Sequence, residues 1–501
     1  MTKYKVFVST FLASVMMLAA CGDKSSEPAN PDDKPNQPQQ PVVQAKDVKT
    51  LTTTSSLSYD LAEDYLEYST GSNMAPSTIK LLPSETYQTI DGFGAAITGS
   101  TAYNLMKMNA ADRENFLVQT FSPSKGYGYS YVRIPIGCSD FSLKEYTCCD
   151  TPGIENFALT SEETDYIIPV MKEILAINPD VKVMSAPWTA PKWMKVDNLT
   201  NLKPYDSWTS GQLNPKYYDD YATYFVKWIQ AFENNGIKIY GVTPQNEPLN
   251  RGNSASMYMG WEEQRDFIKN SLGPKMQEAG LSTKIYAFDH NYNYDDIASQ
   301  KSYPAKIYED AEASKYIAGA AYHNYGGSYN ELENIHKAYP DKELVFTEST
   351  AGDWNDGANL KARLIDDMEQ ITLGTVNRWA KGSIVWNLML DSNRGPNRPG
   401  GCINGFGAVD LGADNKTIRK NSYYYIMAHM ASAVKPDAQR IGTTGFTANG
   451  LTYSAFKNVD GSYALVLSNR SASPVSFTVD DGTHHFPATV PANGILSLSW
   501  K

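Results

Sequence analysis

The sequence predicts an α/β protein, a (β/α)₈ TIM barrel with a side β-sandwich built from the C-terminal strands plus an N-terminal segment. From about residue 92, short apolar runs alternate with amphipathic stretches eight times, which is the pattern of eight parallel strands joined by helices. After about residue 430 the chain changes to short alternating strands separated by Gly, Asn and Asp turns, typical of a small all-β module. A strand-like stretch before residue 90 is expected to join that module.

The N-terminal residues predict targeting rather than a folded domain. Lys3 and Lys5 precede an apolar run too short to span a bilayer, and the run ends in LAAC at Cys21, which resembles a bacterial lipoprotein signal over residues 1–20. An ordinary secretory signal with an incidental cysteine is the alternative. Residues 21–46 are rich in Pro, Ser, Asp, Asn and Gln and predict a disordered tether. We therefore expect an outer-membrane lipoprotein of the bacterial cell envelope, surface-exposed or periplasmic, that meets the membrane only through its lipidated cysteine.

The remaining chain divides into three predicted segments: residues 47–90 with strands for the sandwich, 91–425 forming the barrel, and 426–501 forming the C-terminal β-sandwich. An open doubly wound sheet is the alternative, but it favours a GxGxxG turn, and the stretch GFGAAITGS does not fit that pattern. The eight predicted barrel strands are Gly92–Ile97, Tyr129–Ile136, Val181–Ala186, Ile239–Pro244, Lys284–Asp289, Ile317–His323, Glu343–Glu348 and Ser383–Leu388.

Local patterns support both modules. Aromatic residues recur near 3.6-residue spacing from Pro215 to Asn234, which predicts an amphipathic helix between two barrel strands. In the C-terminal module, His484 and His485 are expected in a polar turn. The predicted strands of that module are Thr444–Asn449, Leu451–Asn458, Tyr463–Arg470, Val475–Asp480 and Ile495–Trp500.

Composition excludes some partners. The 44 Lys and Arg against 55 Asp and Glu give a net charge of −11, which argues against nucleic acid, because phosphate binding needs clustered cations. Aromatic residues make up 12%, as is common in carbohydrate-handling proteins, although many serve packing. No CxxC or HxxxH spacing indicates a metal site, and we expect no cofactor. Four further cysteines could form disulfides in an oxidising envelope: Cys138, Cys148, Cys149 and Cys402.

Two glutamates stand where a barrel places its chemistry, just past the carboxyl ends of its strands. The fourth predicted strand ends in TPQNEP with Asn246 and Glu247, and the seventh ends in FTEST with Glu348. Either glutamate alone could cap a helix or pair with an arginine. Together at one barrel mouth they are what glycosidic cleavage requires, since one protonates the departing oxygen while the other attacks the anomeric carbon. The sequence therefore predicts a glycosidase.

Other strand ends supply candidate sugar-binding residues. The second strand gives Arg133, which could orient the attacking carboxylate, and Asp140 follows, which could hold sugar hydroxyls; a structural ion pair is the alternative for Arg133. Trp188 and Trp193 follow the third strand and Trp386 lies in the eighth. Tryptophans at a barrel mouth suit stacking on sugars, with one of the three expected in the core.

The sixth strand ends in His323 and Tyr325. The tyrosine could hydrogen-bond the attacking carboxylate, whereas a lone histidine is more often structural. A retaining enzyme needs its two carboxylates about 5 Å apart. Arg133 nearby would favour the ionised form of the attacking carboxylate, and the charge of that carboxylate would raise the pKa of the other carboxyl group, which must begin protonated.

The motifs match a known family in order over about residues 80–500. The matching stretches are IDGFGAAITGSTA from Ile90, RIPIGCSDFS from Arg133, APWTAPKWMK from Ala186, GVTPQNEP from Gly241, WNLMLDSNRGPN from Trp386 and NSYYYIMAHMASAVKPDAQRIG from Asn421. They resemble glycoside hydrolase family 30, which includes glucosylceramidase and β-1,6-glucanases. The resemblance implies retaining hydrolysis of β-linked sugars, with Glu247 as the acid/base and Glu348 as the nucleophile. The residues implied to surround the sugar are Arg133, Asp140, Trp188, Asn246, His323, Tyr325 and Trp386.

One departure guides the expected substrate. The glucosylceramidase type ends its sixth strand in His-Trp-Tyr, whereas this chain has His323-Asn324-Tyr325, which argues against a glucosylceramide-like site. A lipoprotein of a bacterial envelope is expected to digest a polysaccharide, and we expect β-1,6-glucan as the substrate of a monomeric enzyme. The alternatives are a glucosylceramidase-like enzyme, a β-xylanase or a β-glucosidase of the same family. Endo or exo action and transglycosylation stay open. A carbohydrate-binding surface lipoprotein without activity is the non-enzyme alternative, but it would not need both strand-end glutamates.

Overall fold

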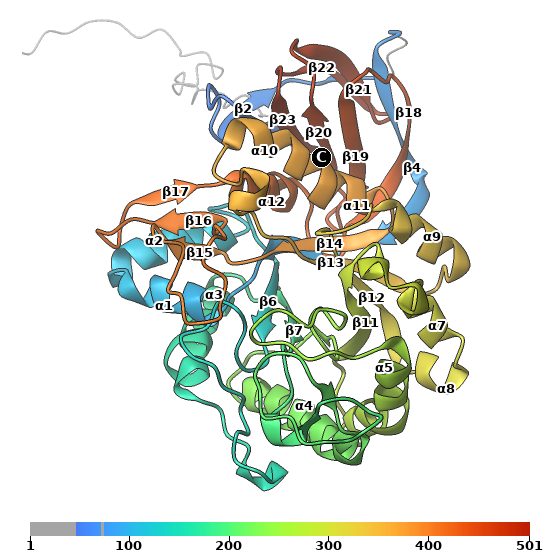
Figure 1. Cartoon of the computed structure of the whole chain (residues 1–501). Coiled ribbons are helices and arrows are strands. Elements are labelled where there is room, and N and C mark those ends of the chain that lie inside the picture. Colours follow the sequence, from blue (N-terminus) through green and yellow to red (C-terminus); the bar gives the residue numbers. More distant parts are fainter. Residues whose placement is uncertain (1–46, 72–74) are drawn as a thin grey trace, which may run out of the picture. The chain divides into compact units, whose positions relative to one another are not determined.

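The structure is a computed structural model that describes residues 47–71 and 75–501, so the predicted signal, Cys21 and the tether lie outside the described residues. An eight-stranded parallel sheet forms the barrel (Figure 1). It closes where the Ile97 N–H donates to the Arg133 carbonyl at 2.9 Å. All eight predicted strands are confirmed. In spatial order they are β5 (Gly92–Ala95), β14 (Ala380–Val385), β13 (Glu343–Glu348), β12 (Ile317–His323), β11 (Lys284–Asn291), β10 (Gly241–Val242), β7 (Lys182–Ala186) and β6 (Tyr131–Pro135).

Helices lie around the outside of the barrel (Figure 1). The predicted helix from Pro215 begins as η4 and continues as α4, which buries Phe225, Trp228 and Phe232 on one face. The α-helices are α1 (Gly99–Lys107), α2 (Ala110–Phe121), α3 (Ile168–Ile177), α4 (Tyr218–Glu233), α5 (Trp261–Phe267), α6 (Gly273–Glu278), α7 (Tyr303–Tyr308), α8 (Ala311–Ser314), α9 (Asn330–Ala338), α10 (Leu360–Asp367), α11 (Gly374–Val376) and α12 (Ser422–Ala433). Short 3₁₀ and π turns are η1 (Ile154–Asn156), η2 (Glu163–Ile167), η3 (Lys192–Met194), η4 (Pro215–Tyr217), η5 (Ile268–Leu272), η6 (Tyr294–Asp296), η7 (Ala298–Gln300), η8 (Asp353–Asn355) and η9 (Met368–Leu373).

The chain ends share a second, ten-stranded sheet, as predicted for the β-sandwich. In spatial order its strands are β2 (Ala62–Leu66), β1 (Val48–Thr54), β23 (Gly494–Trp500), β20 (Tyr463–Asn469), β19 (Leu451–Lys457), β18 (Gln439–Gly445), β4 (Thr78–Thr89), β21 (Val475–Asp480), β22 (His484–Val490) and β3 (Ser69–Thr70). Two small sheets pair β8 (Lys195–Val196) with β9 (Gln212–Leu213), and β15 (Met389–Asp391) with β16 (Val409–Leu411) and β17 (Ile418–Lys420).

Two local predictions in the sandwich were wrong. The strand expected over Thr444–Asn449 is instead β18, which ends at Gly445, where φ is +96° and the chain turns away. The polar turn expected at His484 and His485 is the start of β22, which pairs with Thr70 of the N-terminal segment. The polar residues around His484 indicated a turn. The strand that pairs with them lies more than 400 residues away in sequence, so local sequence could not reveal it.

Helix α12 joins the barrel to the sandwich. It is buried along almost its whole length and contacts β5 on the barrel and β20 and β23 on the sandwich. The two ring nitrogens of its buried His429 lie 2.9 Å from the hydroxyls of Ser497 and Thr53. Burial lowers the pKa of His429 to about 3, so an uncharged histidine ties both chain ends to the helix.

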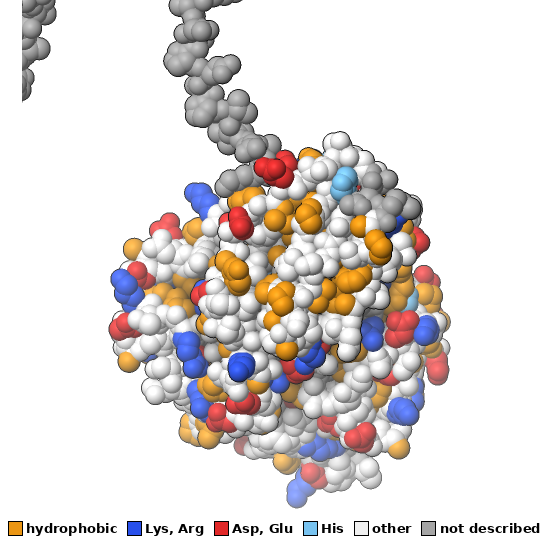
Figure 2. Space-filling view, turned by 90° about the horizontal axis from the view of Figure 1, so that it is seen from above, with side chains coloured by type: hydrophobic (Ala, Val, Ile, Leu, Met, Phe, Trp, Pro, Cys, Tyr) orange, Lys and Arg blue, Asp and Glu red, His pale blue; other side chains and the backbone are white. Residues whose placement is uncertain are grey.

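Figure 2 looks onto the sandwich end, where hydrophobic side chains gather toward the middle of the face and charges of both signs lie mainly around it. Over residues 47–71 and 75–501, no helix has the length and apolar character needed to cross a bilayer. The four cysteines of this part, for which disulfides were considered, are all free.

Candidate functional site

The carboxyl ends of the barrel strands surround a pocket of about 460 Å³ that contains both predicted glutamates. This volume lies within the range of small-molecule sites. The pocket is mostly polar. The lining residues are Asp140, Glu247, Asn250, Asn253, His290, Asn291, Asp295, Tyr325, Glu348, Thr350, Trp354 and Cys402.

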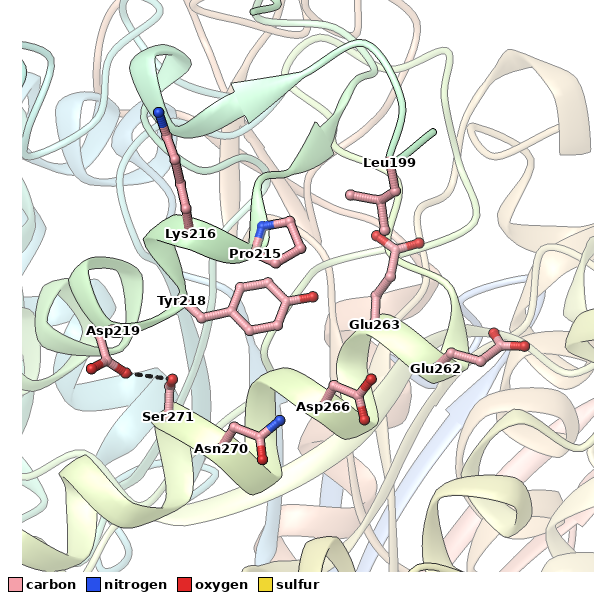
Figure 3. Close-up of a pocket in the computed structure, with 10 residues that line it drawn as sticks. All are labelled: Leu199, Pro215, Lys216, Tyr218, Asp219, Glu262, Glu263, Asp266, Asn270 and Ser271. Carbon is pink, nitrogen blue, oxygen red and sulfur yellow. Dashed lines mark hydrogen bonds between the residues drawn. The ribbon is translucent and has the colours of Figure 1, made fainter. Parts of the chain in front are cut away.

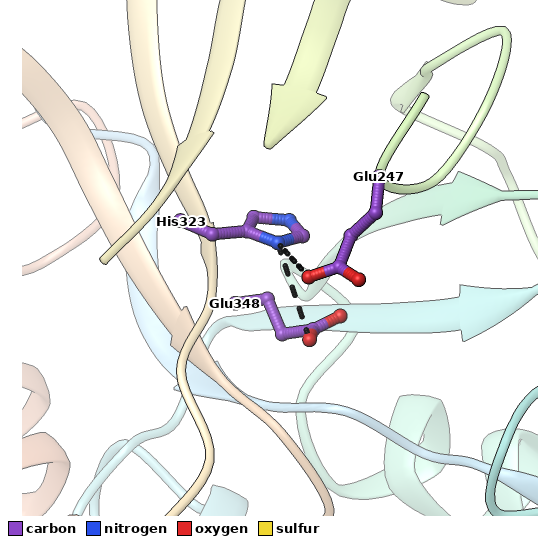
Figure 4. A group of neighbouring side chains, drawn as sticks. All are labelled: Glu247, His323 and Glu348. Atoms are coloured by element: carbon purple, nitrogen blue, oxygen red, sulfur yellow. Dashed lines mark hydrogen bonds and ion pairs between the residues drawn. The ribbon is translucent and has the colours of Figure 1, made fainter. Parts of the chain in front are cut away.

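The two glutamates face each other across this pocket (Figure 4). One carboxylate oxygen of Glu247 and one of Glu348 lie within 4.8 Å of each other, and both side chains are buried. Glu247 has a left-handed backbone with φ of +45°, a strained conformation for a residue with a side chain. Asn250 and Asn253 donate to Glu247 Oε2 at 2.8 and 3.1 Å. The separation suits direct attack at a sugar carbon and leaves no room for an intervening water.

The buried side chain of Arg133 pairs with Glu348. Its Nη1 donates to Glu348 Oε2 at 2.6 Å, and its Nη2 donates to the side-chain oxygen of Asn246 at 2.8 Å. The Tyr325 hydroxyl lies 2.9 Å from Glu348 Oε1 and from the Thr350 hydroxyl. The sequence-predicted Arg133, Asn246 and Tyr325 are therefore brought together around one carboxylate.

A further carboxylate, Asp289, links the parts of the site. It is fully buried and accepts from Arg133 Nη2 at 2.8 Å, while its other oxygen lies 3.0 Å from His323 Nε2. The hydroxyls of Thr243 and Thr347 each donate to it at 2.6 Å. His323 Nδ1 in turn lies 3.4 Å from Glu247. Asp289 thus connects the cation beside Glu348 to the histidine beside Glu247.

The predicted tryptophans occupy a different place from the one expected. Trp188 and Trp386 are only 2% and 1% exposed, and their rings stack with centroids 5.0 Å apart. The Arg133 guanidinium lies 5.0 and 5.3 Å from the two rings, a cation–π arrangement. Trp193 is partly buried and donates to the Cys149 carbonyl. Trp188 and Trp386 therefore pack against Arg133 in the interior, and neither of them presents an open face for stacking.

The pKa values reflect crowding of carboxylates. Burial together with the charges of Glu348 and Glu247 raises the pKa of Asp140 to about 7. Burial alone would lower the pKa of His323, but Glu348, Asp289 and Glu247 raise it to about 9, so His323 is a cation at neutral pH.

The pKa values of the two glutamates shift in directions opposite to those expected from the sequence. Burial raises the pKa of Glu348, and the charge of Glu247 adds to this against the effects of His323 and Arg133. Burial would also raise the pKa of Glu247, but the nearby histidines, His290 first, lower it. Burial lowers the pKa of His290 itself, so at neutral pH His290 is uncharged and this largest lowering effect on Glu247 disappears.

Sequence reasoning missed several residues that line the pocket, and it also missed the buried Asp289 behind them. Asp289 and His290 lie at the end of the fifth predicted strand, where the same strand-end rule would have found them. Asn250 and Asn253 follow Glu247 in the next loop, and Trp354 follows Glu348 by six residues. Loop residues carry no periodic pattern, so only the folded structure places these three in the pocket.

The site has one group of side chains that could approach a metal ion. Glu247, His323 and Glu348 offer ligand atoms within 4.8 Å of one another. However, His323 faces Asp289 through one nitrogen and Glu247 through the other, and Arg133 already neutralises Glu348. The positive charges of Arg133 and His323 within this cluster disfavour the binding of a metal cation. The arrangement is better suited to a neutral sugar than to a metal.

A second pocket lies away from the barrel mouth, beside η4, α4, α5 and η5 (Figure 3). It contains none of the predicted site residues. Its Ser271 donates to Asp219 at 2.6 Å, and Glu263 accepts from Gln212 and from the Gly260 N–H at the start of α5. These bonds fix helix ends, so the acidic side chains there have a structural explanation.

A barrel with two facing glutamates at its mouth and a side β-sandwich defines a glycoside hydrolase. The family models described as the glycosyl hydrolase family 30 TIM-barrel domain and β-sandwich domain match residues 90–434 and 437–498. The chain belongs to glycoside hydrolase family 30, as the sequence motifs predicted.

Three similar proteins carry names that state an activity. A solved structure titled "The endo-beta1,6-glucanase BT3312" is 65% identical with a TM-score of 0.89, covering 91% of this chain and 99% of that one. An endo-1,6-β-D-glucanase of Neurospora crassa is 31% identical over 82% of this chain and 86% of its own length. The lysosomal acid glucosylceramidase of Mus musculus is 27% identical over 87% of each.

Proposed function

We propose that this protein is a retaining endo-β-1,6-glucanase that uses Glu348 as the nucleophile and Glu247 as the acid/base. The single observation that supports the mechanism most directly is the carboxylate separation of at most 4.8 Å. A retaining pair lies about 5 Å apart, whereas an inverting pair needs about 6.5–9.5 Å to admit water. The geometry therefore favours double displacement.

In the first step, the Glu348 carboxylate forms a bond to the anomeric carbon while the glycosidic C–O bond breaks. The leaving oxygen takes the proton of Glu247, and a covalent glycosyl-enzyme results. Glu247, now a carboxylate, then removes a proton from water, which attacks the same carbon and releases Glu348. The Arg133 and Tyr325 hydrogen bonds to Glu348 favour its charged form before attack and after release.

Glu247 and Glu348 together are expected to hold one proton, which is the proton that the first step needs. Arg133 and His323 contribute two positive charges, and Asp289, Glu247 and Glu348 contribute up to three negative ones. A buried cluster approaches neutrality, so one carboxyl of the pair is expected to hold a proton. Moving that proton to Glu247 leaves Glu348 with both of its hydrogen-bond donors, which is the reactive state.

Support for β-1,6-glucan comes from the relatives. The two named glucanases match this chain over most of its length and of their own, and one of them is 65% identical to it. The glucosylceramidase is less similar. A product profile on β-1,6-glucan, xylan, glucosylceramide and aryl β-glucosides tests the assignment. We expect gluco-oligosaccharides from the interior of β-1,6-glucan, and cleavage of xylan or glucosylceramide alone would refute the substrate.

Substitution with azide rescue tests the two roles. Glu348→Ala should lower hydrolysis by about 10⁴-fold or more, and azide should restore turnover as the α-glycosyl azide, because it replaces the nucleophile. Glu247→Ala should spare the first step for substrates with good leaving groups, and azide should give the β product. Near-normal activity of Glu348→Ala would rule out this assignment.

We also propose that a monomeric enzyme is held at the outer membrane by lipidated Cys21. The LAAC motif and the polar stretch after it support this. Cys21→Ala should move the protein from the membrane fraction to the soluble fraction of cells. Unchanged membrane association would contradict the anchor without affecting the proposed chemistry.

A further inference from the structure

We propose that Trp354 is a stacking platform for a glucosyl unit of the polymer beyond the unit that Glu348 attacks, an inference that rests on the proposed function. Trp354 is 51% exposed and lines the same pocket as both glutamates. An indole usually buries a large apolar area, so half-exposure inside a polar pocket is typical of a binding surface rather than of packing.

The other candidate rings are already engaged. Trp188 and Trp386 are buried against each other and Arg133. Tyr325 is partly exposed, but its hydroxyl is held by Glu348 and Thr350. Among the pocket-lining residues that the structure describes, Trp354 is the one tryptophan. It is therefore the ring available to cover the apolar face of a sugar while neighbouring Asn and Asp side chains meet hydroxyls.

The loop beneath Trp354 is built to hold the ring in place. A Cβ on Gly352 would lie 2.1 Å from the Trp354 ring, so only glycine lets the indole rest on the backbone there. The Asp353 N–H donates to the Asn404 carbonyl at 3.0 Å, and Asp353 pairs with Arg394. The loop between β15 and β16, which contains Arg394 and Asn404, thus holds η8 in place, so the exposed ring needs little ordering when a sugar binds.

The test separates polymer binding from the chemistry at Glu348. β-Glucosyl fluoride carries one sugar and a small leaving group, so it needs only the site beside Glu348, whereas β-1,6-glucan also needs the neighbouring units. We expect Trp354→Ala to lower kcat/KM on β-1,6-glucan about tenfold, mainly through KM, and to change β-glucosyl fluoride hydrolysis less than about twofold. Trp354→Phe should recover part of the loss, because a ring remains.

Two further variants act as controls. Leu202→Ala removes a side chain of similar exposure, 48%, outside the pocket, and both activities should stay unchanged. Arg394→Ala keeps the ring but frees its loop, so it should give a smaller loss on the glucan alone. Melting temperatures of all variants show whether they are folded.

If Trp354→Ala loses kcat/KM equally on both substrates, or loses none on either, the proposed role of Trp354 as a stacking platform is overturned. If wild type hydrolyses β-glucosyl fluoride but leaves β-1,6-glucan intact, the proposed substrate fails instead. The same comparison is then made on whichever β-glucan wild type cleaves, and an unchanged Trp354→Ala there overturns the inference.

Discussion

The two ends of the barrel both carry charged side chains, but they pair them differently. At the amino end, Lys182 bonds Asp91 at 3.0 Å, while Lys284 and Lys381 bond Glu343 at 2.9 and 2.8 Å. Lys381 also lies 3.5 Å from Asp91, so these carboxylates share a network of three lysines. At the carboxyl end, three carboxylates share the two cations Arg133 and His323; they are Asp289, Glu247 and Glu348. The charges of the two glutamates also help burial to raise the pKa of Asp140 to about 7.

Left-handed backbone is more frequent at the carboxyl end, although Trp379 just before β14 at the amino end also has a φ of +74°. The carboxyl end contains residues with left-handed φ: Glu247, Phe288, Asp289 and Asn387. Such conformations cost about 1–3 kcal/mol each. The difference teaches that lysines outnumber the carboxylates they pair with at the amino end, whereas the carboxyl end combines the ion pairs of Arg133 with like-charge crowding and backbone strain where the chemistry lies.

The largest expected effect that tests this contrast is at Asp289. Asp289→Asn removes the charge that binds both Arg133 and His323, so the nucleophile and acid/base lose their alignment. We expect kcat/KM on β-1,6-glucan to fall by about 10²-fold with little loss of thermal stability.

The pH profile shows whether Asp289 acts through His323. The pKa of His323 is raised to about 9, so its cation persists below that pH and is lost above it. Without Asp289 the basic limb of the activity profile should move to lower pH, since one of the raising charges is gone. A lower rate with an unmoved basic limb would contradict this coupling.

The matched change at the amino end is Glu343→Gln. Lys381, Tyr286 and Lys284 lower the pKa of Glu343 to about 2 against the effect of burial. Losing this partly exposed carboxylate should lower the free energy of unfolding by about 2 kcal/mol, measured by urea denaturation. The activity of the folded enzyme should not change. If Glu343→Gln lost activity but not stability, the proposed division between a structural amino end and a catalytic carboxyl end of the barrel would be contradicted.

A pH-dependent effect, smaller over one pH unit than the loss expected for Glu343→Gln, is expected at His429 in the barrel–sandwich junction. Its folded pKa is about 3, below the ordinary 6.5, so the unfolded chain binds a proton that the folded chain does not. Stability should therefore fall as pH drops below about 6.5, by about 1.4 kcal/mol per pH unit from this group. Urea unfolding of His429→Gln between pH 4.5 and 7 should show a shallower slope than wild type. Equal slopes would exclude His429 as the source.

The smallest expected effect is that of a chelator. Dialysis against EDTA should leave β-1,6-glucan hydrolysis unchanged, because Arg133 and His323 already supply positive charge to the glutamates. Activity that is lost with EDTA and restored by a divalent cation would show that Glu247, His323 and Glu348 bind a metal.

The strand pattern and the strand-end rule predicted much of the site. Alternating apolar runs fixed the eight barrel strands, and the position of Glu247 and Glu348 just past two of them was enough to place both in one pocket. Strand ends meet at one face of any such barrel, so this part of the arrangement follows from local sequence.

Contacts between distant segments were decided only by the tertiary structure. Trp188 and Trp386 follow different strands, and nothing local indicates that they stack beneath Arg133 instead of opening to solvent. β22 was mistaken for a turn because its partner β3 comes from the other end of the chain. The pKa values of the glutamates depend on burial and on histidines from other strands. Burial and through-space charge are properties of the folded neighbourhood, which residue spacing does not encode.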